Sequence, residues 1–296
     1  VYEHVKAQLD GFDLVYCQGF TGWAFIRARR CGELRAPVLS NLHGYEMFQL
    51  APSFRTRLFR GPMRRLARRI SLGSDAVFSF GGRITEILLG MGMRRENILE
   101  CPIGIEASWL VDAAVAPKPT ERVFVFLGRD ERRKGVKELS LALRSLIHDG
   151  NTGFKFHFIG PIDEDNKVVD ERIVYHGAVH SEERVKTLLR ASDVLLCTSY
   201  AEGMPTVIME AMASGLAIIA TDVGAISQQV TDNGWLLAKP EPSAIKAAME
   251  EAIRLPVEEL SNMKRRSLEK ARDQFTWELV IDRKVELMSR YGQVGR

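Results

Sequence analysis

Residues 193–220 read DVLLCTSYAEGMPTVIMEAMASGLAIIA, two apolar runs on either side of an apolar helical pattern. The runs DVLLCTS (residues 193–199) and LAIIA (residues 216–220) are short and bounded by turn residues, which predicts buried strands. Between them, Pro205 suits the first position of a helix and Gly215 suits its C-terminal stop. A strand, a helix and a second strand in this order predict parallel strands joined by a crossover helix.

The same alternation runs through the whole chain and predicts an α/β protein whose parallel sheets are covered by helices on both faces. Further strands are expected at residues 13–17, 37–41, 75–79, 123–128 and 154–160, and helices at residues 137–148, 181–191 and 205–214. A small, proline-bearing segment at residues 111–120 predicts a domain boundary. We therefore expect two Rossmann-like, doubly wound domains, residues 1–115 and 116–275. Their ligand should lie in the cleft at the carboxyl ends of the strands.

The first of these domains is expected to be incomplete. Only three or four strands are expected before the boundary, whereas a full Rossmann-like domain has about six. The chain also begins with Val1 rather than Met. The first strands of this domain are therefore expected to lie upstream of the chain or to be absent.

The composition is that of a globular protein, with 46% hydrophobic and 27% charged residues. No apolar run approaches the ~20 residues of a membrane span, and no basic-then-apolar leader opens the sequence. The four cysteines are far apart, so we expect neither a disulfide framework nor a zinc site; they are Cys17, Cys31, Cys101 and Cys197. These features predict reduced thiols and a cytoplasmic protein.

The net charge is only +3, but positive charge is concentrated between Arg55 and Arg69. This stretch, RTRLFRGPMRRLARR, holds seven arginines and no acidic residue, and several of the arginines recur at helical spacing. One interpretation is a solvated helix face. The other is a basic helix on an anionic membrane, which would place the protein on the inner face of that membrane. Nucleic acid is not expected as a partner, because no stacking aromatics or reader motif accompany the arginines.

A narrow polar stripe is expected on the helix at residues 205–214. Thr206, Glu210 and Ser214 recur every four residues and share one face, whereas the other side chains are mostly apolar. Since a buried carboxylate needs a partner or a ligand, we expect the stripe to face a cleft. There the Glu210 carboxylate would accept two hydrogen bonds from a ribose diol. Free N–H groups at residues 204–208 predict a phosphate site at the helix N-terminus, and Glu202 is expected to hold hydroxyls of a further group.

A second phosphate-binding element is predicted in FLGRDERRKG, residues 126–135. Arg129 and Lys134 lie on a strand-to-helix turn between Gly128 and Gly135, and these glycines let the turn tighten. Charge-assisted contacts to phosphate contribute about 1.5–3 kcal/mol each. The two cations and the helix N-terminus would therefore stabilise a departing diphosphate without a metal ion. An ordinary charged turn is the alternative, since two further arginines share the segment.

Together these segments resemble the retaining glycosyltransferases of family four, also called group-one glycosyltransferases, which have the two-domain GT-B fold. The resemblance is carried by G-R-x4-K-G at residues 128–135 and by E-G-x-P-x4-E-A-x-A-x-G at residues 202–215. Supporting matches are IATDVGA (219–225), DNGWLL (232–237) and FTWELV (275–280). The resemblance covers residues 13–291 and implies that a last helix, within residues 276–296, returns to the first domain.

The resemblance implies a role for each of these residues. Arg129 and Lys134 would bind the donor diphosphate and act in catalysis. Glu202 would contact the donor sugar as a further catalytic residue, and Glu210 would bind the ribose. Other donor contacts are implied for Gly128, Gly203, Met204, Pro205, Thr206 and Val207.

Two more sites are implied by the same resemblance. His176 and Gly177 would belong to the donor site, since the loop that follows them would lie against the base. His43, in NLHGYE after a predicted strand, would enter the cleft as a catalytic residue. The chain departs from the family at Ile103, where Asn is common, and at GAISQ (residues 224–228), where the family often has Gly-Gly-x-x-Glu. We interpret both departures as subfamily variation, because they lie away from the phosphate-binding residues.

The predicted function is transfer of a sugar from a nucleotide-diphosphate sugar to a saccharide or lipid-linked acceptor hydroxyl, with retention of configuration. Such a reaction would belong to glycan, lipopolysaccharide or glycolipid biosynthesis. No cofactor or metal is expected, and the D-x-D at residues 163–165 is interpreted as a solvated acidic loop rather than a metal ligand. Two alternatives stay open from the sequence: a non-catalytic nucleotide-sugar-binding subunit, and a nucleotide-sugar epimerase of the same fold.

Overall fold

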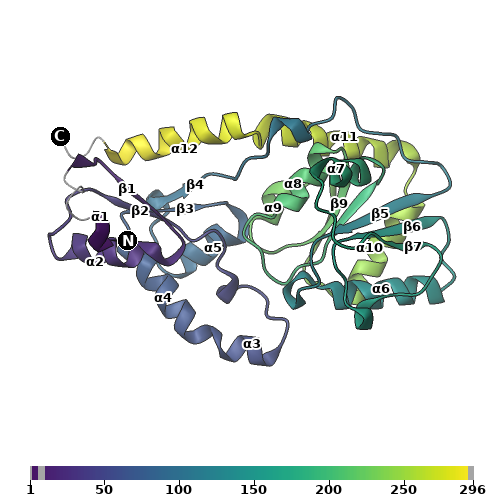
Figure 1. The fold of residues 1–296 in the computed structure, drawn as a ribbon, viewed down its shortest axis with the longest axis horizontal. Coiled ribbons are helices and arrows are strands. Elements are labelled where there is room, and N and C mark those ends of the chain that lie inside the picture. The colour runs from purple at the N-terminus through teal and green to yellow at the C-terminus, as the bar shows by residue number, and fades with distance from the viewer. Residues whose placement is uncertain (1, 6–10, 293–296) are drawn as a thin grey trace.

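Two lobes, each built on a parallel β-sheet, make up the computed structural model of the chain, which describes residues 2–5 and 11–292 (Figure 1). One sheet has four strands and the other has six, and every strand pair in both is parallel. The prediction of an α/β fold with parallel sheets is therefore confirmed.

The first lobe holds the four-stranded sheet. Its strands are β1 (Val15–Gln18), β2 (Val38–Asn41), β3 (Ala76–Ser79) and β4 (Ile98–Glu100), paired in this order. Its helices are α1 (Tyr2–Val5), α2 (Trp23–Arg30), α3 (Phe54–Leu58), α4 (Arg60–Gly73) and α5 (Gly82–Gly90).

The second lobe holds the six-stranded sheet. Its strands are β5 (Arg122–Leu127), β6 (Phe154–Ile159), β7 (Ile173–Tyr175), β8 (Val194–Cys197), β9 (Ala217–Thr221) and β10 (Gly234–Leu237). Their order across the sheet is β10-β9-β8-β5-β6-β7. The helices that follow the first lobe are α6 (Val136–His148), α7 (Glu182–Arg190), α8 (Thr206–Ala213), α9 (Ile226–Gln229), α10 (Pro242–Arg254), α11 (Val257–Gln274) and α12 (Trp277–Gly292).

Both faces of the second sheet are buried, which explains its nearly continuous apolar strands. Successive strand side chains point to opposite faces. In β5, Phe124 and Phe126 belong to the core that includes α6 and α10, whereas Val125 belongs to the core that includes α8. All three side chains are almost fully buried. An apolar residue is therefore needed at every position, not at every second one.

Helix α12 crosses from the second lobe to the first (Figure 1). Its residues Val280 and Leu287 pack with Leu39 and Phe78 of the first sheet. At its start the chain is tightly packed, because a Cβ on Gly104 would lie 2.6 Å from the Trp277 ring. No helix among the described residues is both long enough and apolar enough to cross a bilayer.

Candidate functional site

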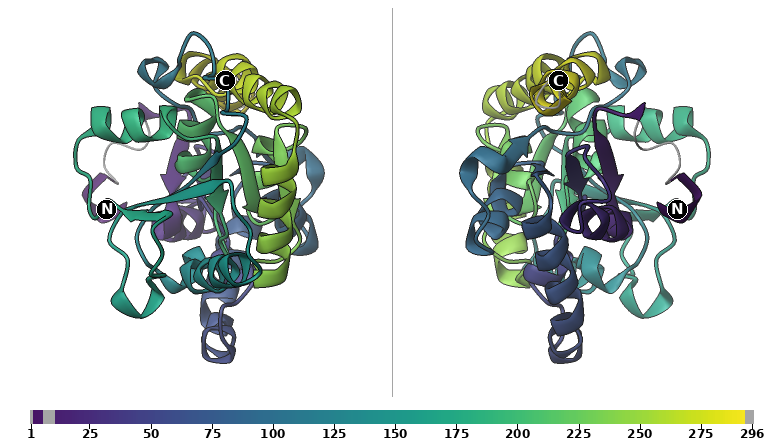
Figure 2. Two further views of the ribbon diagram at one scale, coloured as in Figure 1. Left: turned by 90° about the vertical axis from the view of Figure 1, so that its right-hand side faces the viewer. Right: turned by 90° about the vertical axis from the view of Figure 1, so that its left-hand side faces the viewer.

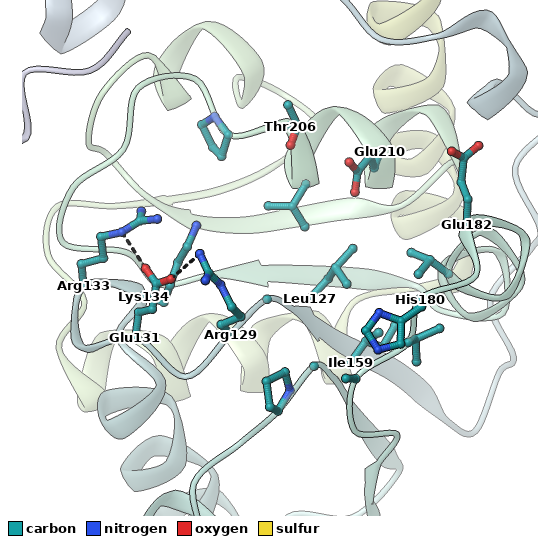
Figure 3. Close-up of a pocket in the computed structure, with 18 of the residues that line it drawn as sticks. Leu127, Arg129, Glu131, Arg133, Lys134, Ile159, His180, Glu182, Thr206 and Glu210 are labelled. Atoms are coloured by element: carbon teal, nitrogen blue, oxygen red, sulfur yellow. Dashed lines mark hydrogen bonds and ion pairs between the residues drawn. The ribbon is translucent and has the colours of Figure 1, made fainter. Parts of the chain in front are cut away.

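A cavity of about 730 Å³ opens at the carboxyl ends of β5 and β6, beside the N-terminus of α8 (Figure 3). Its volume is within the usual range for small-molecule sites, and ligands of parallel sheets bind at this end of the strands. It brings together seven of the predicted residues: Gly128, Arg129, Lys134, Pro205, Thr206, Val207 and Glu210. The structure thus unites the two segments that the sequence analysis singled out.

The turn after β5 is held in place by the end of β8. Gly135 has a φ of 71°, and a Cβ at this position would lie 2.0 Å from the carbonyl oxygen of Thr198, so only glycine fits. The N–H of Tyr200 donates to the carbonyl of Arg133 over 2.7 Å. These contacts fix the short 3₁₀ helix Arg132–Lys134 against the sheet, with Arg133 and Lys134 in the cavity lining.

Glu202 is paired with the cations of this turn. One of its oxygens, Oε1, accepts hydrogen bonds from Lys134 Nζ and Ser199 Oγ, each over 2.7 Å, and the other accepts from Arg133 over 3.2 Å. The Glu202 residue is only 6% exposed and is absent from the residues that line the cavity. Three protein donors therefore hold its carboxylate away from the cavity lining, and the predicted contact between Glu202 and the sugar stays a prediction.

Glu131 connects the two arginines at the rim of the cavity (Figure 3). Its carboxylate pairs with Arg129 over 2.7 Å and with Arg133 over 2.9 Å. An arginine has five N–H donors and a lysine has three, so these contacts leave donors on all three cations unused. Arg129, Arg133 and Lys134 are therefore held in place yet still able to bind an anion.

Glu210 lies on α8 and faces the same cavity (Figure 3). No hydrogen bond or ion pair to its carboxylate is found within the part of the chain that the structure describes. Burial, and secondarily repulsion from Glu182, raise the pKa of Glu210 to about 6. Nearby, the N–H groups of Thr206 and Val207 begin the helix and lack acceptors among the described residues. The helix therefore presents both anion-binding N–H groups and an unpaired carboxylate.

His176 and Gly177 lie just outside the cavity lining, and their predicted contacts with the donor stay a prediction. The backbone N–H of His176 still donates a hydrogen bond to the neighbouring strand. The Nε2 atom of its side chain lies 3.1 Å from Nδ1 of His157 on that strand. The carbonyl of Gly177 accepts from the N–H of Gly160 over 2.8 Å. Residues 178–180 of the loop that follows line the cavity instead.

His43 lines a second cavity of about 420 Å³, together with Gly203 and Met204. The Nε2 atom of His43 lies 3.2 Å from Oε1 of Gln18, and burial together with the charge of Lys284 lowers the pKa of His43. The lobes meet closely here, because a Cβ on Gly203 would lie 2.1 Å from the carbonyl oxygen of His43. His43, Gly203 and Met204 are therefore grouped apart from Arg129 and Lys134.

Further contacts join the lobes at the loop before α8. The Gln49 side chain donates to the carbonyl of Glu202 over 2.6 Å and accepts from its N–H over 3.2 Å. Arg83 and Asp222 form an ion pair over 2.7 Å. Through Gln49, the first lobe therefore fixes the backbone just before α8.

The sequence analysis missed several residues of the site. Arg133 and Glu131 share a charged turn with similar neighbours, and no spacing rule distinguishes them. Trp109, His180 and Glu182 also line the cavity, but they lie outside both motifs. Only the folded chain brings them to the site.

Residues 121–254 match the family described as glycosyl transferases group 1. TuaC of Bacillus subtilis, named for teichuronic acid biosynthesis, is 35% identical over 133 residues, which are 45% of this chain and 32% of TuaC. WcaL of Escherichia coli, named for colanic acid biosynthesis, is 24% identical over 279 residues, which are 88% of this chain and 66% of WcaL. The chain thus spans less than two thirds of the length of either relative.

The solved structure of sucrose-phosphate synthase from Thermosynechococcus elongatus has the same fold, with a TM-score of 0.75. The match covers 97% of this chain and 79% of that protein. Since the sequences are only 19% identical, this likeness shows the fold alone. The arrangement of two lobes with parallel sheets is the GT-B fold. The match over residues 121–254, together with the GT-B fold and the two motifs at one cavity, identifies the second lobe as a group 1 glycosyltransferase domain and supports a group-one glycosyltransferase.

Proposed function

We propose that the chain is a retaining glycosyltransferase that moves a sugar from a nucleotide-diphosphate sugar to an acceptor hydroxyl during polysaccharide biosynthesis. One observation carries the proposal: a single cavity has three cations on one side and, from α8 on the other, free helix N–H groups and a carboxylate without a partner among the described residues. A nucleotide sugar offers matching groups, a diphosphate and a ribose diol. The names of TuaC and WcaL, both tied to polysaccharide biosynthesis, support the pathway class.

Negative charge grows on the diphosphate as the bond to the sugar breaks. Arg129, Arg133 and Lys134 would stabilise this charge, together with the N–H groups of Thr206 and Val207. The cations are already held by Glu131 and Glu202, so little reorganisation is needed when the charge develops. These groups supply the charge stabilisation that a divalent metal could supply, and we therefore propose a metal-independent reaction.

Glu210 would hold the ribose on the opposite side of the cavity. An ionised carboxylate accepts hydrogen bonds from two hydroxyls, and the described residues offer it no other donor. The acceptor would approach from the cavity that contains His43, where the two lobes meet. Its hydroxyl would then attack the sugar in the cleft between the lobes.

The test compares Lys134→Met with Lys137→Met, which removes an exposed lysine on α6 outside the cavity. Isothermal titration with UDP, GDP and ADP first identifies the nucleotide that binds the wild-type protein. Lys134→Met should weaken the binding of that nucleotide about ten- to a hundredfold, because one charge-assisted phosphate contact is lost. Lys137→Met should bind as the wild type does. Equal affinities of the wild type and Lys134→Met would refute the diphosphate site.

Turnover is measured with the corresponding sugar nucleotide and a set of acceptors. Released nucleotide together with a glycosylated product identifies a transferase. NMR of the product then reports whether the anomeric configuration is retained. An unchanged rate after treatment with EDTA is expected, and loss of activity that added metal restores would contradict the metal-independent reaction.

A further inference from the structure

Helices α3 and α4 project from the first lobe beyond the rest of the molecule (Figures 1 and 2). At the projecting end, Phe54 is 79% exposed, Leu58 is 69% exposed and Phe59 is 77% exposed. Large apolar side chains are seldom left this open together unless a partner covers them. The projecting segment, residues 54–69, thus has an apolar end that no other described part of the chain covers.

Positive charge runs from this apolar end along both helices. All seven arginines of residues 55–69 lack an ion pair within the described chain, although arginines on other helices pair with carboxylates, such as Arg265 with Glu269. Arg60 donates to the carbonyls of Gln49 and Leu50, and Arg64 donates to the carbonyl of Met47. The remaining five arginines have no hydrogen bond or ion pair among the described residues, and they are Arg55, Arg57, Arg65, Arg68 and Arg69.

The fold anchors the segment by one face only. Ala67, Ile70 and Ser71 of α4 are fully buried, and Ser71 Oγ lies 2.8 Å from the hydroxyl of Tyr45. Helix α3 has no buried residue, and Ser53 caps it by accepting the N–H of Thr56 over 3.2 Å. The exposed apolar side chains and free arginines are therefore not needed to hold the helices in place.

One side of the segment also borders the second lobe. A cavity of about 390 Å³ is lined by Phe59 and Met63 from the segment and by Arg133 and Tyr200 from the second lobe. Met63 also lines the neighbouring cavity that contains His43. A partner bound to the segment would therefore lie beside both of these cavities.

We propose that residues 54–69 dock the protein on an anionic lipid bilayer, with Phe54, Leu58 and Phe59 in the interface and the arginines on lipid phosphates. Charge complementarity favours this occupant, because exposed apolar side chains followed along the helices by arginines without ion pairs among the described residues match an apolar layer covered by anionic headgroups. If the proposed function holds, docking on a bilayer also assigns the class of the acceptor. An acceptor anchored in that bilayer enters the cleft from the docked side.

The test is flotation of the wild-type protein with vesicles of phosphatidylcholine alone or mixed with phosphatidylglycerol, without nucleotide. Binding is expected to the mixed vesicles and to weaken in high salt. Arg55→Gln/Arg57→Gln/Arg65→Gln should weaken it about a hundredfold, since each arginine near an anionic surface contributes about fivefold. Phe54→Ser/Leu58→Ser should weaken it roughly tenfold or more.

The matched control is Ile281→Ser/Val285→Ser, which removes two exposed apolar side chains from α12. This variant should float as the wild type does. Equal flotation of all variants, or no preference for the anionic vesicles, would overturn the docking proposal. So would a dimer of the wild type that Phe54→Ser/Leu58→Ser dissociates, because a second copy would then cover the surface.

The outcome is separable from that of the proposed function. A wild-type protein that floats but binds no nucleotide refutes the transferase and not the docking. One that binds a nucleotide but does not float on anionic vesicles refutes the docking alone.

Discussion

Nucleotide binding should weaken as the pH falls through about 6, because Glu210 must be ionised to accept hydrogen bonds from both ribose hydroxyls. Burial raises the pKa of this carboxyl to about 6. With that value, the ionised fraction falls from about nine tenths near pH 7 to about one tenth near pH 5. If only the ionised form binds the diol, affinity should fall about tenfold over this range.

The same shift predicts the sign of a stability change. A carboxyl whose pKa is raised on folding binds more protons in the native than in the unfolded state between the two pKa values. Its contribution therefore favours folding at low pH and is lost as the pH rises from about 4.5 to about 6. The total change in the free energy of unfolding is about 2 kcal/mol, and Glu210→Gln should remove this pH dependence.

The assay is isothermal titration of the nucleoside diphosphate at several pH values and constant ionic strength. Wild type is compared with Glu210→Gln and with Glu251→Gln, a control on an exposed position of α10. Titration of the ligand's own phosphate affects all three proteins alike. Glu210→Gln should show the shallower pH dependence. A pH dependence equal to that of the wild type would refute the assignment of Glu210 to the ribose.

Three further substitutions test how the second lobe holds the site. Gly135→Ala should lower the free energy of unfolding in urea by about 2 kcal/mol or more, because its Cβ would collide with the Thr198 carbonyl. Lys264→Met should lower the free energy of unfolding by about 3–5 kcal/mol, because it leaves the buried Asp193 carboxylate without its partner 2.8 Å away. The double variant with Asp193→Asn should recover part of that loss. Glu202→Gln should lower the free energy of unfolding by about 3 kcal/mol. It should also weaken nucleotide binding, because the two cations that Glu202 orients lose a charged partner. Unchanged urea midpoints would contradict each of these arguments.

The fold could be predicted wherever strands are buried on both faces. The inner strands β5, β8 and β9 are short apolar runs, because helices cover them on either side. The three strands that the sequence analysis did not predict are β4, β7 and β10, and each lies at the edge of its sheet. An edge strand pairs on one side only and is partly open to water, as in β10, where none of the four residues is buried. These three strands are also only three or four residues long, so their apolar runs are too short to indicate a strand by themselves.

The site could be predicted to the extent that local geometry decides it. Arg129 and Lys134 flank one turn, and Thr206 and Glu210 share one helix face, so spacing alone indicates which way they point. The partner of Glu202 could not be found in this way. Lys134 lies 68 residues earlier in the chain and reaches Glu202 only because β5 and β8 are neighbours in the sheet.

The two glutamates before and within α8 differ because only one of them has protein partners. Burial of Glu202 is tolerable because Lys134 and Arg133 neutralise it, and the same contacts hold those cations beside the cavity. Glu210 has no such partner among the described residues, and its raised pKa reflects that lack. The proposed phosphate side of the site is thus organised before a ligand arrives, whereas the carboxylate on the proposed ribose side would gain its hydrogen bonds only from the ligand. Loss of Glu202 should therefore disturb affinity and stability together, while loss of Glu210 should lower affinity and leave the fold at least as stable at neutral pH.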